Sequence, residues 1–224
     1  MLDSFHFIPL LTNAQKRFIF YYSINRLRNV LDGNQEMMKA YPTRSYGPEA
    51  RLEEAQIPVP EPSSGQILIE VKASSLNPVD NMFLRHDIGM NPELPAVLHG
   101  DVAGIVSAVG KSVDSFKSGD EVYACAGGFK SHGGALVEYM IADALLVAHK
   151  PRTLDFASSA AFPLVSITAW EGLMDRANLR SGQHVLIHGG TGGVGHIALQ
   201  LAKIKGAQVA TTISSEDKAK IACD

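Results

Sequence analysis

The sequence has few of the residues that would indicate a disulfide scaffold, a zinc ribbon or a strongly charged surface. Of its 224 residues only two are cysteines, Cys125 and Cys223, and they lie far apart. They form neither a metal-binding pair nor a disulfide framework, so a reducing, cytoplasmic setting is favoured. Acidic and basic residues nearly balance, at a net charge of −3, which argues against nucleic acid or an anionic membrane as a partner.

Long apolar runs are lacking as well. The longest uncharged stretch, residues 156–170, is shorter than the roughly 20 residues that a membrane-spanning helix needs, and it contains Pro163. We therefore expect a buried helix there and no contact with a membrane. The rest of the composition, with 46% hydrophobic residues, is that of a globular chain.

Residues 1–37 are predicted to form an extension ahead of the first domain. They contain no acidic residue between positions 4 and 31, and four apolar residues recur at helical spacing, Phe20, Ile24, Leu27 and Leu31. Such a composition is typical of an organelle-targeting segment, which would imply a mitochondrial location. The interpretation we favour is an upstream start, with Met37 or Met38 as the true first residue.

Residues 38–150 have the alternating apolar segments and the Gly and Pro punctuation of an antiparallel β domain. Strands are expected over 66–72, 102–109 and 119–124, with one or two more within 135–147. From Pro151 the pattern changes, and helices are expected over 154–161 and 164–177. The sequence thus predicts a barrel-like β domain, 38–150, followed by an α/β domain, 151–224.

A glycine-rich turn follows a short apolar run in the α/β part. Residues 185–187 suit a buried parallel strand, the following helix has Val194, Ile197 or Ala198, Leu201 and Ile204 on one face, and a second strand is expected over 207–213. Between strand and helix, Gly190, Gly192 and Gly195 match G-x-G-x-x-G. In this pattern the first glycine permits the tight turn, the second lets the backbone approach a pyrophosphate, and the third lets helix and strand pack.

The turn therefore predicts a dinucleotide site formed by Gly190, Gly192, Gly193, Val194 and Gly195. A structural turn without a ligand is the alternative. An NAD site would carry Asp or Glu about 20 residues beyond the first glycine, where it binds the ribose hydroxyls.

Thr212 stands at that place instead of an acid. Thr212, Ser214 and Ser215 can donate hydrogen bonds to a 2′-phosphate, and Lys218 adds positive charge, so NADP(H) is favoured. Two acidic residues between the serines and Lys218 argue against this. The alternative is that Ser214 or Ser215 merely caps a solvent-facing helix.

Several further segments carry a family resemblance, and they extend from about Met38 to the end of the chain. They are Ser75–Asp80, Gly100–Gly104, Gly119–Val122, Thr168–Trp170, Gly182–Leu186 and Gly192–Gly195. In combination they resemble the medium-chain dehydrogenase/reductase superfamily, in its zinc-independent quinone oxidoreductase branch, with Thr191 as a small departure. The resemblance implies a chaperonin-10-like catalytic domain, an incomplete Rossmann domain for NADP(H), and a cleft between them.

The resemblance also allows the presence of zinc to be tested. Zinc alcohol dehydrogenases of this superfamily carry Cys where Asn77 stands and His where Asp101 stands, with four closely spaced cysteines for a structural zinc. Cys125 and scattered histidines do not supply the three or four ligands that zinc requires, so no metal is expected. His99 is the best remaining ligand candidate, and we interpret it as a loop or core histidine.

Without a metal, the expected reaction is hydride transfer from NADPH to a quinone or an α,β-unsaturated carbonyl, whose oxygen gains charge that hydrogen-bond donors can stabilise. The resemblance implies that Asn77, Asp80 and Thr168 lie near nicotinamide and substrate. From the residues alone, Asn77 before Pro78 is equally typical of a helix N-cap with Asp80 at N3, and Thr168 of a buried helix residue. No proton donor is identified, which leaves water.

Two other interpretations stay open. The protein could be a zinc-less alcohol or aldehyde reductase. Alternatively, because the chain supplies only about two strands of a doubly wound sheet, it could be a catalytically incompetent truncated fragment or an interaction module. A full-length enzyme of this kind could form a homodimer.

Overall fold

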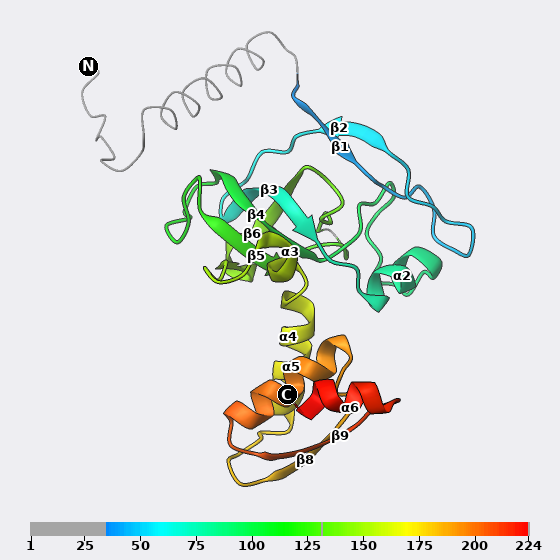
Figure 1. The fold of residues 1–224 in the computed structure, drawn as a ribbon. Helices are drawn as coiled ribbons and strands as arrows, with labels where there is room; N and C mark the ends of the chain where they lie inside the picture. Colours follow the sequence, from blue (N-terminus) through cyan, green and yellow to red (C-terminus); the bar gives the residue numbers. More distant parts are fainter. Residues whose placement is uncertain (1–34, 131, 224) are drawn as a thin grey trace, which may run out of the picture.

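The computed structural model describes residues 35–130 and 132–223, and it has a β-rich part and an α/β part with helix α4 between them (Figure 1). Most of the predicted extension lies outside these residues. Its last residue, Met37, begins β1 (Met37–Ala40), which pairs with β2 (Ala55–Pro58). In the described part of the chain, no helix is long and apolar enough to cross a membrane.

The β-rich part contains a five-stranded antiparallel sheet in the order β6-β3-β4-β5-β7. The strands are β3 (Gln66–Ser74), β4 (Asp101–Val109), β5 (Glu121–Cys125), β6 (Tyr139–Asp143) and β7 (Val147–His149), with a short 3-10 helix, η1 (Ala144–Leu146), before β7. Alternate residues such as Ile67, Ile69 and Val102 enter one core. The predicted strands are confirmed to within two residues, and 135–147 contains β6 and the start of β7.

Three helical segments lie beside the sheet or beyond it. α2 (Pro78–Arg85) follows β3, α3 (Phe156–Ala160) begins after Asp155, and α4 (Pro163–Trp170) continues into a π-helical turn, η2 (Glu171–Arg176). The Asp155 carboxylate caps α3 by accepting a hydrogen bond from Ser158 N at 2.7 Å. Because α3 contacts β3, β4 and β5, whereas α4 packs mainly on α5 and reaches the sheet at β5, the two helices belong to different parts of the molecule.

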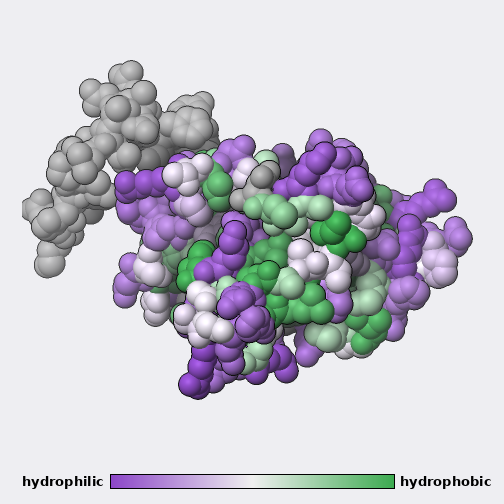
Figure 2. Space-filling view, turned by 60° about the horizontal axis from the view of Figure 1, so that its bottom comes forward, coloured by the Kyte–Doolittle hydropathy of each residue, from purple (hydrophilic) through white to green (hydrophobic). Residues whose placement is uncertain are grey.

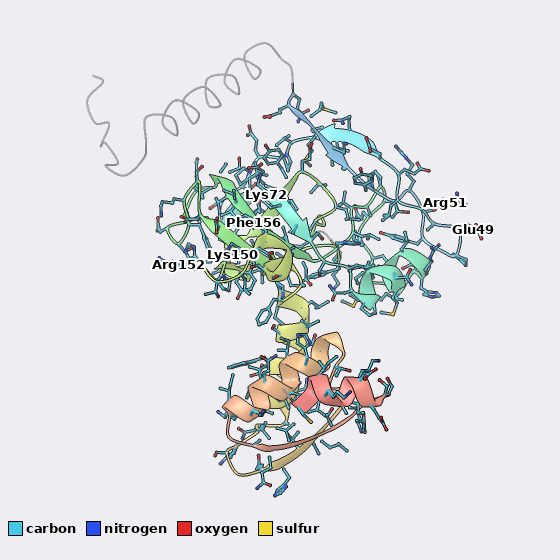
Figure 3. The ribbon with its side chains drawn as sticks, viewed as in Figure 1. Glu49, Arg51, Lys72, Lys150, Arg152 and Phe156 are labelled. Carbon is cyan, nitrogen blue, oxygen red and sulfur yellow. The ribbon has the colours of Figure 1, made fainter. Side chains whose placement is uncertain are left out.

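A lysine secures the chain where the sheet ends and α3 begins. The ammonium group of Lys150 forms an ion pair with Glu121 at 3.1 Å and donates hydrogen bonds to the carbonyl oxygens of Pro151 and Leu154. It also lies 5.3 Å from the centre of the Phe156 ring, and Figure 3 shows the two labelled side chains close together. Four partners thus stabilise one buried cation.

The α/β part is the predicted β-α-β unit. β8 (His184–His188) and β9 (Gln208–Thr212) are parallel, α5 (Gly193–Ile204) connects them, and α6 (Glu216–Cys223) follows. Ile197, Ala198 and Ala202 of α5 share a core with Ile187 of β8. Ile204 follows Ile197 at helical spacing, as predicted, but it lies in the last turn of α5 and is 83% exposed.

Apolar side chains remain at the surface of this part. Figure 2 shows them gathered on the face that is turned forward there. In the α/β part the exposed large apolar residues include Ile167, Trp170 and Leu186, each more than half exposed. A surface of this kind is typical of a site that another protein segment covers.

Candidate functional site

The glycine turn lies between the carboxyl end of β8 and the first turn of α5. Gly192 is the N-cap of α5, and its N–H donates to Gly189 O at 2.9 Å, which closes the turn. The first N–H groups of a helix have no partner within the helix, and they lie at the positive end of its dipole. The N–H groups of Gly193 and Val194 are in this position, which is the arrangement that binds phosphate groups.

Two of the turn's glycines are required by close contacts. A Cβ atom on Gly195 would lie 2.0 Å from Gly189 O, so only glycine lets α5 approach the turn. A Cβ on Gly190 would lie 2.3 Å from Thr211 Oγ1. Gly189, and not Gly190, has the left-handed backbone that favours glycine, at φ +70°. The prediction that Gly190 provides the backbone freedom for the tight turn is therefore wrong.

Gly192 differs from Gly190 and Gly195. The nearest atom to a Cβ there is Gly189 O at 3.2 Å, and no other atom comes within 4 Å. A side chain would therefore extend into the open space in front of α5.

Thr212, at the end of β9, lies beside the turn. Its hydroxyl accepts a hydrogen bond from Gly189 N at 3.1 Å and lies 3.3 Å from His188 Nδ1. Lys218 Nζ donates to Ser214 Oγ at 2.9 Å. The structure thus brings Ser214 together with Lys218, and it places Thr212 against the turn itself.

Ser215 has a different role. Its hydroxyl accepts from Lys218 N at 3.4 Å, across the start of α6. This is the geometry of a helix N-cap, which was the alternative interpretation for this serine.

His188 was not among the predicted site residues, although its place directly before the glycine turn was visible in the sequence.

Asn77 and Asp80 begin α2 in the predicted positions, with Asn77 as N-cap, Pro78 at N1 and Asp80 at N3. Asn77 N donates to Asp80 Oδ2 at 2.7 Å. Burial raises the pKa of Asp80, while hydrogen bonds from the amides of Asn77 and Gly100 act in the opposite direction. Asp80 therefore serves the helix start, as its position predicted.

The side-chain amide of Asn77 is held by residues outside α2. Its Nδ2 donates to Ser75 Oγ at 3.1 Å and to Asp101 Oδ2 at 2.9 Å. Asp101 is fully buried and also accepts from Ser75 Oγ at 2.7 Å and from Leu164 N at 3.0 Å. Both hydrogens of the Asn77 amide are thus engaged by this network.

Thr168, His99 and Cys125 were also considered in the sequence, and the structure places each of them as follows. Thr168 is exposed, and its hydroxyl donates to Leu164 O at 2.8 Å in its own helix, so its interpretation as a buried residue is wrong. His99 lies in the loop before β4, with Nδ1 3.3 Å from Ser74 Oγ. Burial and the nearby Asp101 carboxylate raise the pKa of Cys125 to about 12, so this thiol stays protonated and is no nucleophile at neutral pH.

The positions equivalent to zinc ligands in relatives, Asn77 and Asp101, are hydrogen-bonded to each other. Within residues 35–130 and 132–223, no three His, Cys, Asp or Glu side chains are grouped in a way that could hold a metal ion. An amide nitrogen and one carboxylate do not form the ligand set that zinc prefers.

Comparison with known proteins gives this geometry a family. Residues 63–152 match the alcohol dehydrogenase GroES-like domain. The chain is 35% identical to a quinone oxidoreductase of Rattus norvegicus over 84% of its own length and 56% of the relative's. It is 42% identical to a chloroplastic NADPH-dependent alkenal/one oxidoreductase of Arabidopsis thaliana, over 80% and 48% of the two chains.

A solved structure agrees in fold and in sequence. The quinone oxidoreductase of Coxiella burnetii superposes with a TM-score of 0.74 at 35% identity, over 84% of this chain and 60% of that one. The chain spans about half the length of the curated relatives it matches. By these matches the chain resembles members of the medium-chain dehydrogenase/reductase superfamily, and among them the quinone oxidoreductases.

Proposed function

We propose that this protein is an NADPH-dependent reductase of quinones or α,β-unsaturated carbonyls. The observation that carries the proposal is the turn at Gly192, which is open in front of the α5 N-terminus and has Thr212, rather than an acid, at the end of β9. The names of the relatives, quinone oxidoreductase and NADPH-dependent alkenal/one oxidoreductase, point to the same class.

The chain's residues fit the cofactor in charge and in shape. The N–H groups of Gly193 and Val194 would hold the pyrophosphate, and Ser214 with Lys218 would hold the 2′-phosphate. Thr212 would contribute to that end of the site, and Ser215 would order α6. When bound, NADPH supplies a hydride to the acceptor.

On the substrate side, Asn77 and Thr168 would line the space beside the acceptor. The Asn77 side chain is fixed by Ser75 and Asp101, so it would form a rigid wall of that space without having to reorganise. Asp80 would hold Asn77 through the N-terminus of α2. Water would deliver the proton, because none of the three candidates offers a free acid. A cytoplasmic location is part of this proposal.

Cofactor choice tests the dinucleotide site directly. We expect the wild-type chain to bind NADPH more tightly than NADH in a fluorescence titration. Lys218→Ala should weaken NADPH binding about tenfold, the loss of one charge-assisted hydrogen bond, and should leave NADH binding unchanged. Lys220→Ala, on the same helix but paired with Asp217, is the matched control. Tighter binding of NADH by the wild type would overturn the NADPH assignment.

Turnover tests the reaction. The chain should oxidise NADPH in the presence of at least one quinone or enone from a panel that also contains simple aldehydes. Turnover of aldehydes alone would favour the zinc-less aldehyde reductase. Binding of NADPH with no turnover of any acceptor would favour a non-catalytic role, which the exposed apolar residues of the α/β part also support.

A further inference from the structure

The buried carboxylate of Asp101 bonds to both parts of the molecule. Asp101 is the first residue of β4 and has an exposed fraction of 0%. Its Oδ2 accepts hydrogen bonds from Ser75 Oγ and Asn77 Nδ2, and its Oδ1 accepts one from Leu164 N. A buried carboxylate is tolerated only when its oxygens are bonded in this way.

The two oxygens lead to different parts of the proposed site. On the Oδ2 side, Asn77 starts α2 and belongs to the β-rich part. On the Oδ1 side, Leu164 is the second residue of α4, and α4 packs on α5. The next residue, Val165, lies beside the glycine turn, since a Cβ on Gly193 would be 3.3 Å from Val165 Cγ1.

The contact is also long-range in the sequence. Asp101 and Leu164 are 63 residues apart. In Figure 1, α4 stands between the sheet above and the β8–α5–β9 unit below, so its first turn is the place where the spacing of the two parts is set.

We propose that Asp101 is a positioning residue that holds the Asn77 amide and the start of α4 in one fixed arrangement. It thereby keeps the substrate side of the site at a constant distance from the glycine turn. The catalytic meaning of this link rests on the proposed function, whereas the link itself is a property of the fold.

Two substitutions separate the two sides of the carboxylate. Asp101→Ala removes both acceptors. In Asp101→Asn, the remaining oxygen should face Leu164 N, because this backbone N–H can only donate. Ser75 can rotate to accept from the new NH₂ group, whereas Asn77 can accept from it only by turning its oxygen away from Asp80 N in the capping box. Asp101→Asn should therefore keep the connection to α4 and turn the Asn77 amide around.

The link is tested by the distance between the parts, with no cofactor or substrate present. Spin labels are attached at Lys111→Cys in the β-rich part and at Lys205→Cys after α5, because both lysines are exposed. The background carries Cys223→Ser, so that this exposed cysteine is not labelled as well. Pulsed electron paramagnetic resonance should give a narrow distance distribution for the parent and for Asp101→Asn. It should give a clearly broadened distribution for Asp101→Ala.

The matched control is Asp155→Ala, which removes the cap of α3 near the same junction but no contact to α4. It should keep the narrow distribution. If the alanine variant does not fold, Asp101→Val replaces it, because valine also removes both acceptors but fills more of the buried volume. An unchanged distribution in Asp101→Ala or Asp101→Val would overturn the proposal.

The positioning of Asn77 has a separate readout. Asp101→Asn should lower kcat for NADPH oxidation about 100-fold through misplacement of the amide, while NADPH affinity stays within about twofold of wild type. Parallel loss of affinity and kcat would indicate a merely structural role. Should the wild-type chain show no turnover at all, the proposed function fails, and the distance measurement still decides whether Asp101 links the two parts.

Discussion

Gly195 shows how strictly one residue can be required. An added Cβ would lie 2.0 Å from Gly189 O, so Gly195→Ala must displace either the turn or the start of α5. We expect a loss of about 1–3 kcal/mol in the free energy of unfolding, measured with urea, together with weaker NADPH binding.

Gly192→Ala is the comparison variant for Gly195→Ala. Its Cβ meets one atom, at 3.2 Å, and otherwise extends into open space. It should keep most of the wild-type stability and lose affinity for NADPH, since the methyl group would occupy the space in front of α5. Equal stability of Gly195→Ala and wild type would contradict the steric argument.

At the residue scale, the sequence predicted those contacts whose partners lie within a few positions of each other. The cap formed by Asn77 and Asp80 spans four residues, and the glycine turn spans six, so spacing alone located both. The connection from Asp101 to Leu164 could not be found this way, because it needs the sheet and α4 to be in place. A hint was present, namely a carboxylate at the start of an otherwise apolar strand.

At the scale of elements, His99, in the loop between α2 and β4, makes the stability of the fold depend on pH. Burial lowers the pKa of His99 from its ordinary value of 6.5, although Asp80 and Asp101 act in the opposite direction. The folded chain therefore holds His99 neutral. At pH values between this lowered pKa and 6.5, the unfolded chain binds more protons than the folded chain does. The contribution of neutral His99 to the free energy of unfolding is therefore complete above about pH 6.5 and is lost as the pH falls below it.

His99→Asn tests this response. Asparagine tolerates the left-handed backbone at this position, where φ is 73°. The free energy of unfolding of the wild type should decline as the pH falls from 6.5 toward 5, and the variant should decline less. His184→Asn, at an exposed strand end, is the control and should follow the wild type. An equal decline in all three proteins would rule out His99 as the source.

The faces of helices were harder to predict than their positions. Spacing assigned Ile204 to the same face as Ile197, yet Ile204 is exposed, and Thr168 is exposed rather than buried. Periodicity locates an apolar stripe but does not say which neighbours cover it. Here α4, η2 and the two-stranded sheet together cover Ile197, Ala198 and Ala202, whereas Ile204 in the last turn of α5 stays exposed.

At the scale of the whole molecule, the exposed apolar face of the α/β part sets how the chain behaves in solution (Figure 2). Leu186, on the β8–β9 sheet, is 56% exposed. Burial of such a surface between copies is favourable, so we expect concentration-dependent association in sedimentation velocity.

Leu186→Glu should shift the sedimentation profile toward the monomer, because a carboxylate resists burial. Leu145→Glu is the matched control, since Leu145 is even more exposed, at 93%, but lies on η1 in the β-rich part. It should leave association unchanged. A wild-type chain that stays monomeric at high concentration would contradict the expectation.

The cluster around Lys150 bears on how this protein could be recombined with its relatives. A crossover placed at the predicted boundary after residue 150 would separate the ammonium group from Leu154 and Phe156, and would separate α3 from the strands that it covers. A crossover between α3 and α4 would keep these contacts together. We therefore expect chimeras with relatives to fold best when the crossover between the two parent sequences is placed at about residue 161.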